Sequence, residues 1–161
     1  MLYFEDFDVG RSRSAGIHEL TEPDIIAFAR QWDPQPWHVD PEAAALTHGG
    51  LSASSCHTYS IAALLLNRME PVAGIGSLKH EIELPNAARP GDRLTLTMTC
   101  VEMRESATRP DRGLLTFEGV LANQHALPVL KLRSLMLVRR RPADTQPGPA
   151  GISPRIPEDA A

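Results

Sequence analysis

The apolar residues in the first part of the chain recur at helical spacing. Within residues 20–32, LTEPDIIAFARQW, one helix face collects the apolar side chains Ile25, Ile26, Phe28, Ala29 and Trp32. Thr21 can cap this helix, with Asp24 three residues later. Pro34 disfavours helical geometry at the residue before it, so the pattern predicts a helix that ends at Asp33.

Two prolines then interrupt the chain in DPQPWH, residues 33–38. Pro34 and Pro36 each restrict their own backbone and that of the preceding residue, which predicts an extended, kinked and rigid loop. DPEAAAL follows and is typical of a short helix, with Asp40 as N-cap and Pro41 at the first helical position.

The glycine pair Gly49 and Gly50 precedes a long stretch that has neither glycine nor proline. This stretch, LSASSCHTYSIAALLLNRM at residues 51–69, predicts a helix of about four turns. Its middle, residues 61–66, is apolar on every side, which indicates a helix surrounded by other elements.

From residue 74 onward the pattern changes to the period of two that is typical of strands. Residues 93–103, RLTLTMTCVEM, alternate leucine or methionine with threonine. Further strands are predicted at GIGSLKHEIEL, GLLTFEGVLAN and VLKLRSLMLVRR, with turns at PNAARPGD and NQHAL. Helices followed by an antiparallel meander predict an α+β fold, in which an antiparallel sheet wraps around one long central helix.

The length and composition fit one domain. The chain has 161 residues, of which 42% are hydrophobic, enough for one core and too few for two ordinary domains. We assign this domain to residues 1–141. Residues 142–161 contain five prolines and few large apolar side chains, which predicts an extended or disordered tail.

Charge and cysteine content exclude several functions. The net charge is −4 and no basic block is present, which argues against nucleic-acid binding. The N-terminus is acidic and the longest apolar run, IAALLL, is too short to cross a membrane, so we expect a cytoplasmic protein. Cys56 and Cys100 form no metal-binding or disulfide pattern, and we expect both to be buried.

Several segments, taken in order, resemble the MaoC-like dehydratases and (R)-specific enoyl-CoA hydratases, a family with the hot-dog fold. These segments are YFEDFDVG, TEPDIIAFARQWDPQPWHVDPEAA, GGLSASSCHT, RPGDRL and SATRPDRGLLTFEGVLANQ. The resemblance implies a single hot-dog domain, a homodimer or higher homo-oligomer, and no dissociable cofactor. It also implies a thioester substrate carried on coenzyme A or acyl carrier protein.

The family's catalytic signature is Asp, any residue, Asn, Pro, any residue, His. Here it is matched from Asp33 to His38, with Gln35 in place of asparagine. As bare residues, Asp33 fits a side-chain turn at a helix end, and His38 fits a half-buried histidine. By resemblance they form a pair that activates one water. The two prolines limit the freedom of the loop and so pre-position both side chains. Which of the two carries the proton at rest is left open, because coupled groups titrate jointly.

The start of the long helix is the family's position for stabilising the thioester oxygen through backbone N–H groups. Relatives have segments of the type GGLIASGWHT, from which this chain differs at Ser52, Ser55 and Cys56. The resemblance implies that Ser55 and Cys56 bind this oxygen, and that Gln35 and Ser60 belong to the same oxyanion- and substrate-binding set. It also places Ser60 near the catalytic pair, although simple helix packing explains that serine equally well.

The other histidines and the arginines give weaker evidence for a functional role. His57 is interpreted as structural, and the remaining histidines share no spacing that predicts a metal site. Four arginines can either contact coenzyme A phosphates or be solvated loop charges: Arg89, Arg93, Arg109 and Arg112.

The sequence therefore predicts an (R)-specific enoyl-CoA hydratase, which adds water reversibly to a trans-2-enoyl thioester. Two alternatives stay open. One is a catalytically silent acyl-thioester-binding protein or partner subunit, favoured by the departures at Gln35, Ser55 and Cys56. The other is a hot-dog thioesterase, which needs a carboxylate on or near the long helix, where the chain offers none before Glu70.

Overall fold

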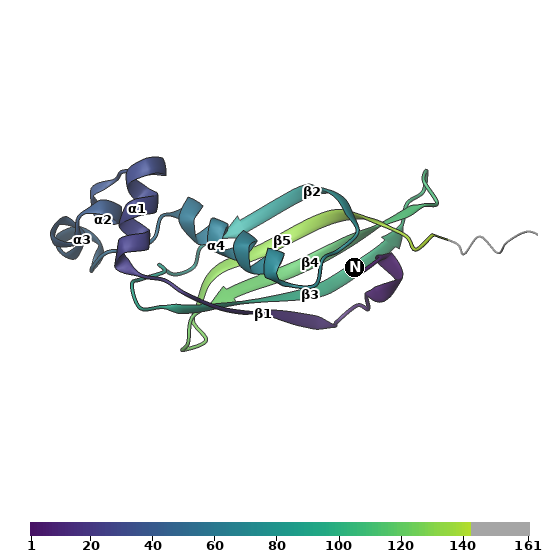
Figure 1. Cartoon of the computed structure of the whole chain (residues 1–161), viewed down its shortest axis with the longest axis horizontal. Coiled ribbons are helices and arrows are strands. Elements are labelled where there is room, and N and C mark those ends of the chain that lie inside the picture. Colours follow the sequence, from purple (N-terminus) through teal and green to yellow (C-terminus); the bar gives the residue numbers. More distant parts are fainter. Residues whose placement is uncertain (143–161) are drawn as a thin grey trace, which may run out of the picture.

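The structure is a computed structural model that describes residues 1–142 (Figure 1). The predicted tail, residues 142–161, lies outside the described residues except for Pro142. The helical elements are η1 (Phe4–Asp6), α1 (Glu22–Trp32), α2 (Pro36–Val39), α3 (Pro41–His48) and α4 (Ser55–Arg68). The strands are β1 (Ser12–Glu19), β2 (Gly74–Glu83), β3 (Arg93–Glu105), β4 (Arg112–Ala122) and β5 (Pro128–Arg139).

The strands form one antiparallel sheet in the order β1-β3-β4-β5-β2. Figure 1 shows α4 lying across one face of this sheet, while α1, α2 and α3 gather beyond the N-terminal end of α4. The predicted α+β architecture of a sheet around one long helix is thus confirmed.

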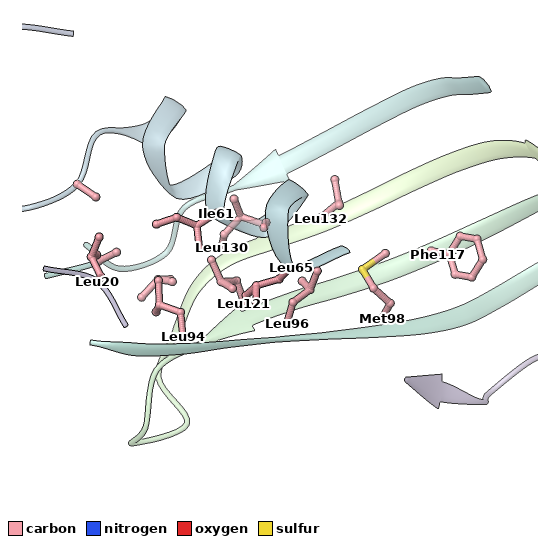
Figure 2. Packing of buried hydrophobic residues seen from close by; sticks show 14 of the residues in the cluster. Leu20, Ile61, Leu65, Leu94, Leu96, Met98, Phe117, Leu121, Leu130 and Leu132 are labelled. Atoms are coloured by element: carbon pink, nitrogen blue, oxygen red, sulfur yellow. The ribbon is translucent and has the colours of Figure 1, made fainter. Parts of the chain in front are cut away.

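The core lies between α4 and the sheet. Ile61 and Leu65 of α4 point toward Leu96, Leu121 and Leu130 of the sheet (Figure 2), and all five are at most 2% exposed. Burying one such side chain contributes roughly 1.5–3 kcal/mol, so this contact fixes the helix against the strands.

The side chains of β3 alternate between the two faces of the sheet, as the sequence predicts. Leu94, Leu96 and Met98 are buried, whereas the intervening threonines lie on the other face. There the hydroxyls of Thr97 and Thr99 form hydrogen bonds with serines of β1 at 2.9 and 2.8 Å. The other face of β3 therefore contributes to pairing with β1 rather than to the core.

The structure corrects the predicted helices in three places. α4 begins at Ser55 rather than Leu51, because Ser54 has extended backbone angles and caps the helix. Within the loop predicted for DPQPWH, residues 36–39 form the short helix α2, since Pro36 is well suited to a first helical position. Leu64 and Leu66 are 42% and 37% exposed, so the middle of α4 is not surrounded by its own chain.

The sequence pattern does not predict β1, which precedes the helices. Its residues, SRSAGIHE, alternate only weakly between apolar and polar, and the strand is specified by pairing with β3. None of the helices within residues 1–142 is both long and apolar enough to span a membrane.

Candidate active site

Asp33 lies at the C-terminal end of α1. The helix is capped at its start by Thr21, whose hydroxyl accepts from the Asp24 N–H, and at its end the Asp33 N–H donates to Ala29 at 2.8 Å. The backbone of Asp33 has left helical geometry because Pro34 follows. Its carboxyl group is thus presented at a fixed helix end.

His38 is brought back toward this carboxyl group by α2. Its Nε2 atom lies 3.8 Å from Oδ2 of Asp33. The imidazole side chain is 10% exposed and the carboxyl side chain 26%. A gap of 3.8 Å is too long for a direct hydrogen bond, yet one water oxygen can lie within hydrogen-bond distance of both atoms. The predicted proximity of the pair is therefore present.

The ring of His38 is oriented by a buried backbone contact. Its Nδ1 atom lies 2.7 Å from the carbonyl oxygen of Ser52. Because a carbonyl only accepts hydrogen bonds, we assign the hydrogen to Nδ1, which leaves the lone pair of the neutral ring on Nε2. The nitrogen that faces Asp33 is therefore the one that can accept a proton.

Gln35 contacts the same carboxyl group from the other side. Its amide nitrogen donates to Oδ1 of Asp33 at 2.8 Å, while Oδ2 faces His38. Gln35 thus fixes the carboxylate through one oxygen, while the other oxygen faces His38 and can accept from a water.

The start of α4 is joined to the pair through Ser52. That residue precedes the N-cap, Ser54, by two positions, and the Ser54 hydroxyl accepts from the N–H of His57. The first-turn N–H groups of Ser55 and Cys56 have no acceptor within the helix, and both residues are exposed. The start of α4 thus offers two N–H donors that have no acceptor within the helix, and Ser52, just before the helix, contacts His38.

The predicted burial of Cys56 is wrong, because its place in the first turn of α4 leaves it exposed. Cys100 is buried as expected, and its burial raises the pKa of the thiol. Ser60 is exposed, and its hydroxyl donates to the carbonyl of Cys56 at 2.8 Å. Among the described residues it forms no hydrogen bond with Asp33 or His38, so its role near the pair stays a prediction.

His57 joins the two helices of the site. Its ring stacks on Phe28 of α1 with a centroid distance of 4.4 Å and an interplanar angle of 4°. It is 8% exposed, and its Nδ1 atom is buried without a hydrogen-bond partner in the described part of the chain. Burial, followed by the nearby His18, lowers the pKa of His57, against a smaller opposite effect of Asp24. A structural role for this histidine agrees with the sequence interpretation.

We therefore expect acid to destabilise the fold through His57. Its pKa in the folded state is below the ordinary value of about 6.5, so below that pH the unfolded chain binds a proton that the folded chain excludes. The free energy of unfolding should fall with decreasing pH, by at most about 1.4 kcal/mol per pH unit for one proton. Urea unfolding between about pH 7.5 and pH 5.5 measures this.

The matched variants are His57→Phe, which keeps a ring against Phe28, and His125→Gln, which changes an exposed turn histidine. His57→Phe should flatten the pH dependence, and His125→Gln should leave it as in the wild type. An unchanged pH dependence in His57→Phe would contradict the assignment.

A cavity of about 260 Å³ lies at the opposite end of α4 from the pair. Its apolar walls come from the segment before β1, from the sheet and from the chain after α4, and include Phe7, Met69, Met98, Phe117 and Met136. Four charged residues also line it: Asp8, Arg11, Arg13 and Glu70. α4 has 14 residues and is thus about 21 Å long, so this cavity is separate from the surroundings of Asp33 and His38. Residues 1–142 contain no group of three or more side chains suited to a metal ion.

The family model for the MaoC-like domain matches residues 8–114. The chain belongs to the MaoC-like family. A MaoC-like dehydratase from Rhodospirillum rubrum is 38% identical, with a TM-score of 0.85 and coverage of 89% of this chain and 100% of that one. The residues matched by the family model, 8–114, span Asp33, His38 and the start of α4 in this MaoC-like protein.

Two more distant structures support the fold of this MaoC-like protein. An (R)-hydratase from A. caviae involved in PHA biosynthesis has a TM-score of 0.66 at 20% identity, over 85% of this chain and 99% of that one. A Mycobacterium tuberculosis protein with a double hotdog fold has a TM-score of 0.75 at 18% identity, over 91% of this chain and 46% of that one. The predicted hot-dog fold is confirmed. A comparison with curated proteins finds no match.

Proposed function

We propose that this MaoC-like protein is an (R)-specific enoyl-CoA hydratase, acting reversibly as a 3-hydroxyacyl-thioester dehydratase. The observation that carries the proposal is the 3.8 Å approach of Asp33 Oδ2 and His38 Nε2, with the histidine hydrogen assigned to Nδ1. This arrangement offers a carboxylate oxygen and a proton-accepting nitrogen to one water molecule.

In the hydration direction, the water oxygen bonds to the β-carbon of the trans-2-enoyl thioester while one of its O–H bonds breaks. The pair takes that proton and delivers a proton to the α-carbon on the same face, so the elements of one water are added in a syn sense. The negative charge that develops on the thioester oxygen is stabilised by the N–H groups of Ser55 and Cys56 at the start of α4.

The direct experiment follows the loss of enoyl absorbance when purified protein is mixed with crotonyl-CoA or with longer trans-2-enoyl-CoAs. We expect turnover with at least one chain length, without any added metal or cofactor. Parallel reactions with acyl carrier protein thioesters identify the carrier. Absence of turnover with every substrate would refute the proposal.

A binding role without catalysis is the second candidate. The apolar cavity of about 260 Å³ favours it, since that cavity can hold an apolar chain and does not include the pair. Saturable binding of acyl-CoA, with neither hydration nor thioester hydrolysis, would support this candidate. The thioesterase alternative is disfavoured because α4, Ser55–Arg68, contains neither aspartate nor glutamate.

We further propose that two copies pair through β2. This strand is at the edge of the sheet, and all ten of its residues are exposed, including Ile75, Leu78 and Ile82. The exposed Leu64 and Leu66 of α4 add further apolar surface. A long edge strand that exposes apolar side chains beside charged ones is normally covered, and a second β2 would satisfy the backbone groups and bury these apolar side chains.

Light scattering at micromolar concentration should therefore give at least a dimer. Lysine on an edge strand opposes pairing, so Leu78→Lys should shift the protein toward the monomer. Leu127→Lys is the matched control, because Leu127 is also exposed, at 43%, but lies in the turn before β5. A wild-type monomer with full activity would contradict the pairing.

A further inference from the structure

We propose that Arg89 is a positioning residue for His38, acting through the backbone that leads into α4. The inference rests on the proposed function for its catalytic consequence, but the contacts themselves are independent of it. The sequence leaves Arg89 as either a phosphate ligand or a solvated charge, and the structure assigns it to neither.

The guanidinium group of Arg89 donates to three backbone carbonyls. Its Nη1 atom contacts the carbonyls of Gly50 and Leu51 at 2.9 and 3.3 Å, and its Nη2 atom contacts that of His48 at 3.0 Å. Hydrogen bonds from a charged donor are stronger than neutral ones, and the planar fork reaches several acceptors at once. One side chain thus holds the whole turn between α3 and α4.

The same segment holds His38. Ser52 follows Leu51 directly, and its carbonyl accepts from Nδ1 of His38 at 2.7 Å. Leu51, Ser52 and the following residues through Ser54 are at most 8% exposed. A carbonyl that is fixed by its neighbours fixes the ring plane of the histidine and keeps its hydrogen on Nδ1.

Arg89 is itself anchored to the sheet. Its backbone N–H donates at 2.8 Å to Asp92, a residue that is 8% exposed, and Asp92 also accepts from the side chain of Asn123 at 3.0 Å. The neighbouring Ala88 carbonyl accepts from the N–H of Ala53 at 2.8 Å. The line of contacts therefore runs from the end of β4 to the imidazole ring.

Space at the turn is adapted to this side chain. Gly49 and Gly50 have φ angles of +67° and +116°, and a Cβ added at Gly50 would lie 3.4 Å from Nη1 of Arg89. Any side chain at Gly50 would be strained by this φ angle, and its Cβ would lie in van der Waals contact with the guanidinium. The glycine pair seen in the sequence thus lets the backbone turn close beside Arg89.

The experiment compares Arg89→Ala and Arg89→Lys with wild type by two readouts. The first is the ¹⁵N NMR tautomer of neutral His38, assigned by loss of its signal in His38→Ala. The second is steady-state hydration of an enoyl-CoA.

We expect Arg89→Ala to lower the population of the Nδ1–H tautomer of His38 and to raise that of the Nε2–H tautomer. We also expect it to lower kcat about tenfold or more with little change in KM, as the loss of a supporting residue does. Arg89→Lys should restore part of the Nδ1–H population and part of kcat, because lysine keeps the positive charge but lacks the planar guanidinium group.

Two controls separate positioning from mere stability. Arg104→Ala removes an exposed arginine near the end of β3, for which no binding role is proposed, and should change neither readout. Val138→Ala opens a small cavity at a fully buried position of β5, and should lower Tm without altering the tautomer of the folded protein.

The outcomes distinguish the two proposals. A folded Arg89→Ala protein with the wild-type His38 tautomer and the wild-type kcat would overturn the positioning role. If the alanine variant does not fold, an Arg89→Lys protein with both values as in the wild type would overturn it. If wild type shows no hydration, the proposed function fails, and a tautomer shift in Arg89→Ala would still support the positioning of His38.

Discussion

Asp33→Asn and His38→Ala should each lower hydration at least about a hundredfold, the usual scale for loss of a general acid or base. In the first variant the introduced amide oxygen would still accept from Gln35, but the side chain could not exchange a proton with water. Without His38 the pair loses the nitrogen that faces Oδ2 at 3.8 Å. Steady-state turnover of an enoyl-CoA measures both effects.

Folding must be checked in each variant. Asp33→Asn alters a partly exposed helix end and should keep the wild-type Tm. His38→Ala leaves the buried carbonyl of Ser52 without its donor, which costs about 1–3 kcal/mol of unfolding free energy. His125→Ala, in an exposed turn, is the control and should retain activity. Near wild-type turnover in either pair variant would remove Asp33 and His38 from the reaction.

Ser55→Pro should cost about a hundredfold or more in turnover, as loss of one oxyanion-type donor does. Ser55 is the first residue of α4, where proline is tolerated, because the lost N–H has no acceptor within the helix. The residue before it, Ser54, has φ −64° and ψ 160°, the conformation that proline requires of its predecessor. The fold is therefore expected to survive while one donor disappears.

Ser55→Gly is the matched variant, because it removes the side chain and keeps the N–H. Its turnover should stay within a few-fold of wild type. Cys56→Ala tests the next side chain in the same way. If folded Ser55→Pro has unchanged turnover, the thioester oxygen is held elsewhere. A large gain from Ser55→Gly would instead indicate that the serine narrows the site, and would favour the binding role.

The elements found from the sequence are those with strong local signals. Thr21, Asp40 and the alternation in residues 93–103 each act within a few positions, and all three appear as predicted. β1 has no such signal, since its pairing partner β3 comes much later in the chain, after all the helices. The sequence places the start of α4 too early because Leu51 through Ser54 look helical in composition, while their burial and capping depend on the fold.

The candidate site also combines features that local sequence predicts with contacts that it does not predict. Asp33 and His38 are five residues apart, so a local motif suggests that they meet. The contacts that orient them come from distant segments: Ser52 lies 14 residues from His38, and Arg89 lies 38 and 39 residues from the carbonyls of Leu51 and Gly50. Nothing in local spacing predicts such contacts. The exposed face of α4 also could not be foreseen, since apolar composition does not say whether one chain or two covers it.

Hydration by the Asp33–His38 pair is tested most directly by incubating crotonyl-CoA with the protein in deuterated water and following the product by NMR. We expect (R)-3-hydroxybutyryl-CoA that carries one deuterium at C2, added on the same face as the hydroxyl group. Formation of free coenzyme A without the hydroxy product, or recovery of unchanged crotonyl-CoA from protein that binds it, would contradict a hydratase function.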